Sequence, residues 1–295
     1  MKNRPRVSVI LLNMNQPALT VACVESLQHC TYSNLEIIVV DQASKDNSVE
    51  LLKKQFPNIK LIANKVNLGF TGGNNLGMLN STGDYFFLLN NDTEVEPGFL
   101  EPLIDALEAD PSAGAASPLI RFYSDKNKIQ YAGGPPKIDL IRGRNSWRGW
   151  MTDYPGNYIT TESTTAAHGA AFLIKVKAAA EVGLLDDDFF IYFEELDWSL
   201  RIIKGGFTIL FVPASEVYHK ESMTMPKEHP FRVRLMTRNR ILLSRKHLNA
   251  VVFFFSLMYA SLISFPRNCV RYIIARNKEL LKAYTKGFYQ GLINQ

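Results

Sequence analysis

Short apolar runs alternate with helix-like stretches along the first half of the chain. The apolar runs are rich in Val, Ile, Leu and Phe and predict buried strands, whereas the stretches between them mix polar and apolar residues as surface helices do. The expected strands are Val7 to Leu12, Leu35 to Asp41, Ile59 to Ala63 and Tyr85 to Leu89, and the expected helices are Ala18 to Cys30, Ser48 to Gln55 and Thr71 to Ser81. This alternation predicts an α/β protein with a mostly parallel, Rossmann-like sheet that helices cover on both faces.

The pattern loosens between Ser124 and Thr165, where Gly and Pro residues are frequent. A long insertion of this kind in a compact domain is usually a functional loop. Regular structure is expected again as a strand at His168 to Ile174, a helix at Lys177 to Val182 and a strand at Phe207 to Val212.

Composition and charge divide the chain into two parts. With 295 residues, 46% of them hydrophobic and 21% charged, the chain can bury a substantial core, and its three irregularly spaced cysteines predict neither a disulfide framework nor a zinc site. From Pro226 to Gln295 thirteen Lys and Arg residues stand against two Glu, a balance of +11, whereas the whole chain carries +5. We therefore expect an α/β domain over residues 1–225 and a basic helical region over residues 226–295.

An apolar segment, Ala250 to Phe265, interrupts the positive charge of the C-terminal region, and cations flank it on both sides. As a helix these sixteen residues would be about 24 Å long, shorter than a bilayer core of about 30 Å. We expect the region to lie in plane on an anionic membrane surface, with a single span and helix packing in a homodimer as alternatives. The N-terminus lacks a secretory signal pattern, and no nucleic-acid-binding motif supports a nucleic acid as partner.

Polar side chains follow three of the predicted strands at their carboxyl ends. Asp41 closes the second strand, Asn67 follows the third, and Asn90 to Asp92 end an apolar run. Because the carboxyl ends of parallel strands meet at one edge of a sheet, these residues should face one crevice, which is the expected nucleotide site.

Three acids lie in an apolar and aromatic segment that would normally exclude them. Glu194, Glu195 and Asp197 occur within Phe189 to Arg201, and His219 follows further along the chain. Because burial of an unpaired carboxylate is costly, acids in such a setting usually have a catalytic role.

Together these motifs resemble a family 2 inverting glycosyltransferase of the GT-A fold, in its bacterial rhamnosyltransferase-like group. The resemblance extends from Arg6 to about Lys220 and rests on five motifs in the order typical of the family. They are Val7 to Ile10, Val39 to Asp46, Asn67 to Asn75, Asn90 to Asp92, and the acidic segment Glu194 to Arg201 together with Pro213 to His219.

The resemblance implies a nucleotide-sugar donor carrying UDP or dTDP. Asp41 resembles the base-binding acid of the family, and a Gly-rich turn would let the backbone approach the donor closely. The expected donor-binding residues are Asn13, Asp41, Ser44, Asn67, Gly69, Asn74, Asn90, Asn91 and Asp92. The alternative for Asp41, and for Asp46, is a plain turn in which the carboxylate accepts a hydrogen bond from nearby backbone.

The resemblance also implies a divalent cation, either Mn²⁺ or Mg²⁺. Asn90, Asn91 and Asp92 stand where the family has Asp-x-Asp, so Asp92 is the expected metal ligand, and His219 matches the second ligand. A carboxylate oxygen and a neutral imidazole both suit such a cation. Asn90 replaces the first acid without bringing a charge, which predicts modest metal affinity from protein groups alone.

Inversion at the sugar carbon requires a base that takes the proton of the acceptor hydroxyl. The base of the family corresponds to Glu195, at a position where Asp is commoner. Glu194 is the nearest competitor. Asp197 is a third candidate, although its i+4 spacing from Arg201 predicts an ion pair that fixes the segment.

Trp147, His168 and Trp198 are the expected acceptor contacts, although Trp147 could instead anchor its loop and His168 could be a structural histidine. We expect transfer of a sugar, with a rhamnose-like donor included, to a hydroxyl of a polysaccharide or lipid-linked acceptor in cell-surface glycan synthesis. The enzyme would be peripheral at the cytoplasmic face of the bacterial inner membrane. The alternative is a catalytically inactive module that binds nucleotide sugars.

Overall fold

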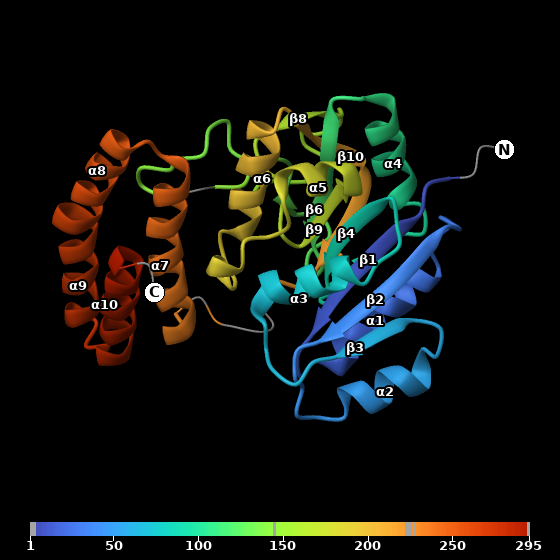
Figure 1. The fold of residues 1–295 in the computed structure, drawn as a ribbon, viewed down its shortest axis with the longest axis horizontal. Coiled ribbons are helices and arrows are strands. Elements are labelled where there is room, and N and C mark those ends of the chain that lie inside the picture. Colours follow the sequence, from blue (N-terminus) through green and yellow to red (C-terminus); the bar gives the residue numbers. More distant parts are fainter. Residues whose placement is uncertain (1–3, 144–145, 222–225, 227, 294–295) are drawn as a thin grey trace.

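The computed structural model describes residues 4–143, 146–221, 226 and 228–293. Within them ten strands form one mixed sheet in the order β3-β2-β1-β4-β9-β6-β10-β5, with β7 paired to β6 and β8 paired to β10 (Figure 1). The strands are β1 Val7–Asn13, β2 Leu35–Asp41, β3 Lys60–Ala63, β4 Tyr85–Asn90, β5 Thr93–Val95, β6 Ala113–Phe122, β7 Ile129–Tyr131, β8 Glu162–Thr164, β9 Ala171–Lys175 and β10 Thr208–His219. The helices around the sheet are α1 Pro17–Gln28, α2 Ser48–Gln55, α3 Gly69–Leu79, α4 Leu100–Ala109, α5 Val176–Val182 and α6 Glu194–Lys204, with a short 3₁₀ turn, η1 Asp187–Phe189, before α6.

The sheet and its helix layers confirm the α/β prediction. Strands β3, β2, β1 and β4 run parallel, β9 lies antiparallel between β4 and β6, and β10 runs parallel to β6. Alternate residues of a strand point to opposite faces, and both faces are buried here. Val9 of β1 belongs to a core cluster with residues of α1, α2 and α4, whereas Ile10 belongs to a cluster with residues of α3, α5 and α6.

Strand β10 is longer than the sequence pattern predicts. The predicted strand Phe207 to Val212 continues through Pro213 to His219, because its pairing with β6 shifts register between Val212 and Glu216 and then resumes. Such an irregularity lets a strand accommodate a residue that cannot donate to the ladder. The extension carries His219 to the edge of the sheet where β4 ends, since His219 pairs there with the first residue of β5.

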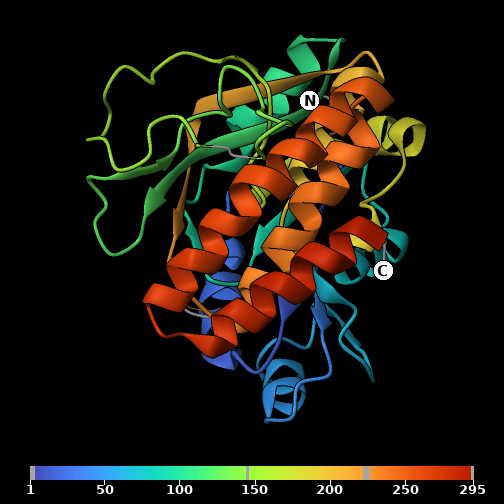
Figure 2. The same cartoon turned by 90° about the vertical axis from the view of Figure 1, so that its left-hand side faces the viewer.

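The C-terminal region is helical, as predicted, and its helices lie side by side at one end of the molecule (Figures 1 and 2). They are α7 Pro230–His247, α8 Ala250–Tyr259, a π-helical turn η2 Ala260–Ser264, α9 Phe265–Ile274 and α10 Lys278–Ile293. Helix α7 contacts the sheet domain through a shared apolar cluster, in which Leu242 and Leu243 pack with Phe193 and Leu196. The predicted boundary at residue 225 lies outside the described residues, and the division into two domains remains a prediction. Helix α7, which the sequence pattern assigns to the second region, packs on the α/β domain.

The apolar C-terminal helix is longer than the predicted run from Ala250 to Phe265. Helices α8, η2 and α9 are continuous from Ala250 to Ile274, a helix of 25 residues that is long and apolar enough to cross a membrane by length and composition. Only 6% of its most apolar window is buried in the protein. One side of α9 packs on α10 through Tyr272 and Tyr284.

Candidate active site

A cavity of about 900 Å³ opens beside the carboxyl ends of β4 and β10. Residues of the β4–β5 turn, of the loop before β9, of the start of α6 and of α7 form its walls. The polar residues among its walls include Asn90, Asp92, Gln130, His168, Glu194, Glu195, His219, Arg232 and Arg240. Several of the sequence-predicted residues, from segments far apart in the chain, therefore meet in one place.

Asp92 and His219 lie within hydrogen-bond distance of each other in this cavity. His219 Nε2 lies 3.0 Å from Asp92 Oδ1, and the other ring nitrogen, Nδ1, lies 2.9 Å from Oε1 of Gln130. Burial alone would raise the pKa of Asp92, but the hydrogen bond with His219 and the charge of that ring hold it below its usual value. Oε1 of Gln130 can only accept, so Nδ1 of His219 donates this hydrogen bond and Nε2 faces Asp92, where it could serve as a second metal ligand.

The side chains around this pair offer ligand atoms that suit a divalent cation, provided that a substrate supplies the remaining ligands. Asn90 Nδ2 lies 3.4 Å from His219 Nε2, so the amide that replaces the first acid is adjacent to the pair. No group of three or more His, Cys, Asp or Glu side chains is arranged to hold a metal within the described ranges. A carboxylate and an imidazole thus provide two ligands, and phosphate oxygens of a donor would have to provide others.

Glu194 and Glu195 lie in the first turn of α6 and both line the cavity. Glu195 faces Gly169, where an added Cβ would lie 3.7 Å from the Cβ of Glu195. Burial raises the pKa of Glu195 to about 7. Burial, and then the neighbouring charge of Glu195, raise the pKa of Glu194 well above its usual value, and Oε2 of Glu194 is buried without a hydrogen-bond partner among the residues described. Neighbouring buried acids whose pKa values are raised, one of them to near neutrality, are typical of an acid–base site.

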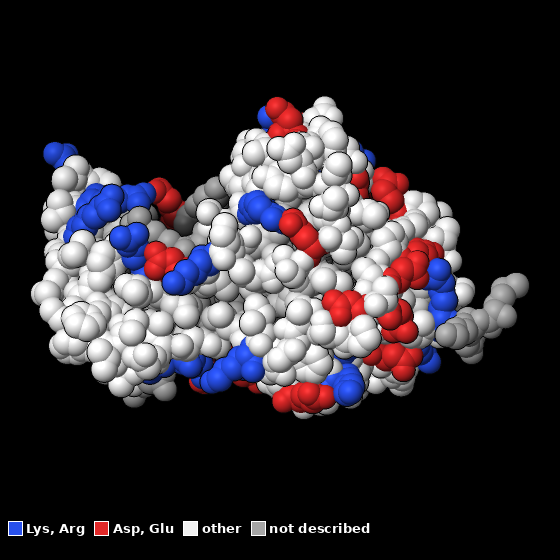
Figure 3. Space-filling model, turned by 90° about the horizontal axis from the view of Figure 1, so that it is seen from above, with Lys and Arg blue, Asp and Glu red and all other residues white. Residues whose placement is uncertain are grey.

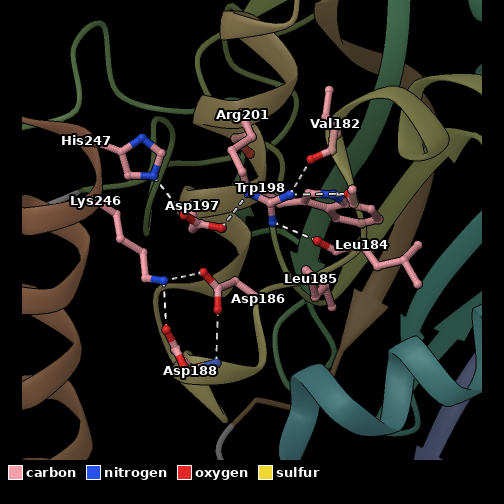
Figure 4. Close-up of polar contacts among 12 residues, drawn as sticks. Val182, Leu184, Leu185, Asp186, Asp188, Asp197, Trp198, Arg201, Lys246 and His247 are labelled. Carbon is pink, nitrogen blue, oxygen red and sulfur yellow. Dashed lines mark hydrogen bonds and ion pairs between the residues drawn. The ribbon is translucent and has the colours of Figure 1, made fainter. Parts of the chain in front are cut away.

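Asp197 lies on α6 but is not among the residues that line the cavity; its carboxylate lies between His247 and Arg201 (Figure 4). Its Oδ2 accepts from Nε of Arg201 at 2.8 Å, which confirms the predicted ion pair, and its Oδ1 is 2.7 Å from Nε2 of His247. The side chain is 2% exposed. The structure therefore gives Asp197 a structural role and removes it from the candidates for the base.

Asn13, Asp41 and Ser44 form a hydrogen-bonded group where β1 and β2 end side by side. Asn13 Nδ2 donates to Asp41 Oδ2 at 2.7 Å, and the backbone N–H of Ser44 donates to Asp41 Oδ1 at 2.9 Å. The alternative of a plain turn is therefore present at Asp41, and also at Asp46, whose Oδ1 accepts from the N–H of Ser48. Asp41 is buried, and its contact with a nucleotide base remains a prediction.

Gly69 shows why the chain needs glycine at the start of α3. Its φ is +74°, and an added Cβ would lie 2.5 Å from the carbonyl oxygen of Phe190. The side chain of Asn67 accepts a hydrogen bond from the N–H of Gly69, so both predicted residues shape this turn. Asn74 and Asn91 do not reach the cavity: Asn74 donates to Phe70 O within its own helix and is 2% exposed, and Asn91 donates to Oγ1 of Thr20. The amide of Asn74 is enclosed in the protein, and its contact with a nucleotide remains a prediction.

The three predicted acceptor residues have different positions. Trp147 and His168 line the cavity with ring centroids 5.0 Å apart. Burial lowers the pKa of His168 to about 3, so its ring is neutral, with Nδ1 accepting from the N–H of Ala170. Trp198 is fully buried against Phe172. The predicted acceptor contact of Trp198 is therefore wrong, because α6 turns this ring into the core.

One wall of the cavity was missed by sequence reasoning. Arg232, Met236 and Arg240 of α7 line the cavity, although the pattern placed α7 in a separate basic region. Their spacing of four residues, which puts them on one helix face, is the signal that could have found them. Their position shows that the basic C-terminal region contributes to the site itself.

The mixed sheet, with acids and a histidine gathered at its carboxyl edge, defines a glycosyltransferase fold of the GT-A type. A profile described as "Glycosyl transferase family 2" matches residues 8–183, and the chain belongs to that family.

The relatives agree with this assignment. The chain is 28% identical over 221 residues to an N-acetylglucosaminyl-diphospho-decaprenol L-rhamnosyltransferase of Mycobacterium tuberculosis, a match that covers 67% of this chain and 70% of the relative. Its structure is similar to that of GalNAc-T7 with UDP, GalNAc and Mn²⁺, with a TM-score of 0.62 at 20% identity over 80% of this chain and 49% of that one. It is also similar to the mannosyltransferase PcManGT from Pyrobaculum calidifontis in complex with GDP-Man and Mn²⁺, with a TM-score of 0.61 at 15% identity over 100% of this chain and 89% of that one. The chain spans about half the length of GalNAc-T7. At these low identities both similarities establish a shared fold and nothing beyond it.

Proposed function

We propose that this protein is an inverting, metal-assisted glycosyltransferase that moves one sugar from a UDP- or dTDP-sugar to a hydroxyl of a polysaccharide or lipid-linked acceptor. Family membership supports the transfer of a sugar from a nucleotide sugar. The rhamnosyltransferase relative supports a rhamnose-like donor and a lipid-linked acceptor, and hence a role in cell-surface glycan synthesis.

The observation that carries this proposal is the convergence of Glu195 with Asp92 and His219 on one cavity. A pKa of about 7 lets Glu195 exist as a carboxylate at neutral pH and still hold a proton well enough to act as a base. Glu195 takes the proton of the acceptor hydroxyl, and the hydroxyl oxygen forms a bond to the anomeric carbon of the sugar. The bond from that carbon to the phosphate oxygen breaks on the opposite face, and its electron pair leaves with the nucleoside diphosphate.

Asp92 and His219 would hold the Mn²⁺ or Mg²⁺ of this reaction. When bound, the cation would neutralise the charge that develops on the leaving diphosphate. The residues of the chain contribute geometry: Gln130 orients the imidazole of His219, and Asn90 lies beside it.

We also propose peripheral membrane attachment through the helix from Ala250 to Ile274. Phe254, Phe255 and Leu262 are each more than half exposed on it. Figure 3 shows Lys and Arg clusters around an otherwise mostly uncharged surface at this end, whereas Asp and Glu gather toward the opposite end. Exposed apolar residues next to cations suit an anionic membrane surface, such as the cytoplasmic face of the bacterial inner membrane.

An in-plane position is favoured over a span by the charges of α9. Arg267 and Arg271 lie within the continuous helix, and a charged side chain at the bilayer centre is costly. Furthermore, α9 packs on α10, which carries Lys278 and Lys282.

The decisive experiment measures sugar transfer and donor hydrolysis with a panel of UDP- and dTDP-sugars in the presence of Mn²⁺. We expect turnover with at least one donor, and a loss of about 10²- to 10⁴-fold in Glu195→Gln, because the amide cannot accept the proton. Nucleotide binding should survive in that variant. Glu181→Gln, on the exposed surface of α5, is the matched control. A wild-type protein that binds nucleotide but turns over no donor would instead be an inactive binding module, in which Asn90 marks lost chemistry.

A further inference from the structure

The segment that leads into the candidate base is held in an unusual backbone conformation. Phe190, Tyr192 and Phe193 have φ values of 62°, 74° and 75°, in the left-handed region that non-glycine residues rarely adopt. Phe193 directly precedes Glu194 and Glu195 at the start of α6. Three such residues in a row of four persist only where the surrounding structure holds them, and such segments cluster at functional sites.

The side chain of Asn239, on α7, holds this segment from one side. Its Nδ2 lies 2.8 Å from the carbonyl oxygen of Phe189 and 2.9 Å from those of Ile191 and Tyr192. Its Oδ1 accepts from Nη1 of Arg238, which fixes the orientation of the amide. Asn239 is fully buried, so water does not compete for these contacts.

The turn at the start of α3 holds the same segment from the opposite side. The carbonyl oxygen of Phe190 accepts from the N–H of Phe70 at 2.6 Å and from the N–H of Thr71 at 3.2 Å. Gly69, next to these two residues, approaches Phe190 so closely that a side chain would not fit. The strained segment is therefore clamped between the predicted donor-binding turn and a helix of the C-terminal region.

We propose that Asn239 is a positioning residue for the transfer reaction: by holding the left-handed segment, it sets the place of Glu195 in the cavity. This inference rests on the proposed function, in which Glu195 is the base. It assigns α7 a part in catalysis that its charge and its distance along the chain from Glu195 do not suggest. Figure 1 shows α7 between α6 and the other C-terminal helices, in a position to do this.

The test compares Asn239→Asp and Asn239→Ala with the wild-type protein. Asp has the same shape but, as a carboxylate, donates nothing and faces three carbonyl oxygens. We expect kcat to fall about 10²-fold, the cost typical of a misplaced catalytic group, while KM for the donor stays within about threefold. Asn239→Ala, which leaves room for water, should lose less, and Asn239→Gln, which keeps the amide protons, should recover part of the wild-type kcat.

Amide hydrogen exchange provides a readout that does not depend on activity. In Asn239→Asp and in Asn239→Ala we expect faster exchange at residues 189–197 and at the N–H groups of Phe70 and Thr71, which donate to Phe190, with β1 unchanged. Asn268→Ala, which removes another amide of the C-terminal region, is the control and should change neither kcat nor this exchange. A wild-type protein without turnover would overturn the proposed function alone, because the exchange result would still test the clamp. Unchanged kcat in an active protein, or unchanged exchange in both variants, would overturn the positioning role of Asn239.

Discussion

The Nε2 atom of His219 lies 3.0 Å from Oδ1 of Asp92, although one ends β10 and the other follows β4. Both side chains are more than nine-tenths buried, so the contact is shielded from water. It exists because β10 continues past Pro213 and pairs with β5. The chain thereby brings these two side chains together at the edge of the sheet without any local sequence motif that contains both residues.

Removing either member of this pair should weaken metal-dependent binding of nucleotide. Mn²⁺ should increase the affinity of the wild-type protein for UDP or dTDP. In Asp92→Asn and in His219→Gln we expect this increase to be smaller by a factor of about ten or more, because one metal ligand is lost. Titration calorimetry with and without Mn²⁺ measures this difference, and EDTA should abolish it in the wild type. Asp105→Asn, at an exposed position on α4, is the control. Equal Mn²⁺ dependence in all four proteins would show that the cation does not bind at this pair.

The raised pKa of Glu195 predicts a pH profile. A base must be ionised, so kcat/KM should rise with pH through about 7 and level off above it. The groups that share the cavity with Glu195 are Glu194, Asp92, His168, His219, Glu221, Arg232 and Arg240. The same shift lowers stability as pH rises. The folded state keeps the proton of Glu195 up to about pH 7, whereas the unfolded chain releases it near pH 4.5. The free energy of unfolding should therefore fall between about pH 4.5 and pH 7.

Steady-state rates between pH 5 and 9 test this prediction, with Glu195→Gln as the comparison. The rising limb should disappear from the residual activity of that variant. A limb that persists in Glu195→Gln would assign the titration to another acid of the cavity, such as Glu194.

The ion-pair network on the far side of α6 should contribute to stability (Figure 4). Burial alone would raise the pKa of Asp197, but the hydrogen bond with His247 and the charge of Arg201 lower it. In His247→Ala one oxygen of a buried carboxylate loses its partner, so the free energy of unfolding should fall by about 1–3 kcal/mol. Urea denaturation at neutral pH measures the change. His29→Ala, at an exposed position, should leave the midpoint within error, and an equal loss in both variants would contradict a specific role for the His247 contact.

The sheet could be predicted from the sequence because most of its long strands correspond to continuous runs of apolar residues. A run such as Tyr85 to Leu89 is buried on both faces, and its polar end marks the edge where ligands bind. The placement of Asn90, Asp92 and Glu195 at the cavity followed from this logic together with the family resemblance.

The rest of the site depends on packing that no local pattern records. Helix α6 is buried on two sides, so Trp198 belongs to the core even though it lies next to the acids in sequence. The wall formed by Arg232 and Arg240, and the clamp at Asn239, come from α7, whose charge resembles that of a surface helix. The sequence predicts a strand that ends at Val212, because Pro213 interrupts the apolar pattern. In the structure the strand continues past Pro213 to His219.

The exposed apolar face of the C-terminal helix should determine membrane binding. Phe254 and Phe255 are each 59% exposed, and burial of a whole Phe side chain contributes about 1.5–3 kcal/mol. We expect Phe254→Ser with Phe255→Ser to weaken binding to vesicles of phosphatidylcholine and phosphatidylglycerol by about 10- to 100-fold. Co-sedimentation at several lipid concentrations measures the partition. Ile159→Ser, which removes an apolar side chain that is 70% exposed and lies outside this region, is the control and should bind as the wild type does.

Extraction of the membrane-bound protein separates an in-plane helix from a span. An in-plane helix held partly by cations should be released by high salt or alkaline carbonate, and it should bind vesicles of phosphatidylcholine alone much more weakly, since each Lys or Arg near an anionic surface contributes about 1 kcal/mol. A spanning helix would resist both treatments and would bind without regard to lipid charge. Sedimentation equilibrium of the lipid-free protein completes the comparison, because a stable homodimer that loses its association in the double Phe variant would show that a second copy, rather than a membrane, covers this face.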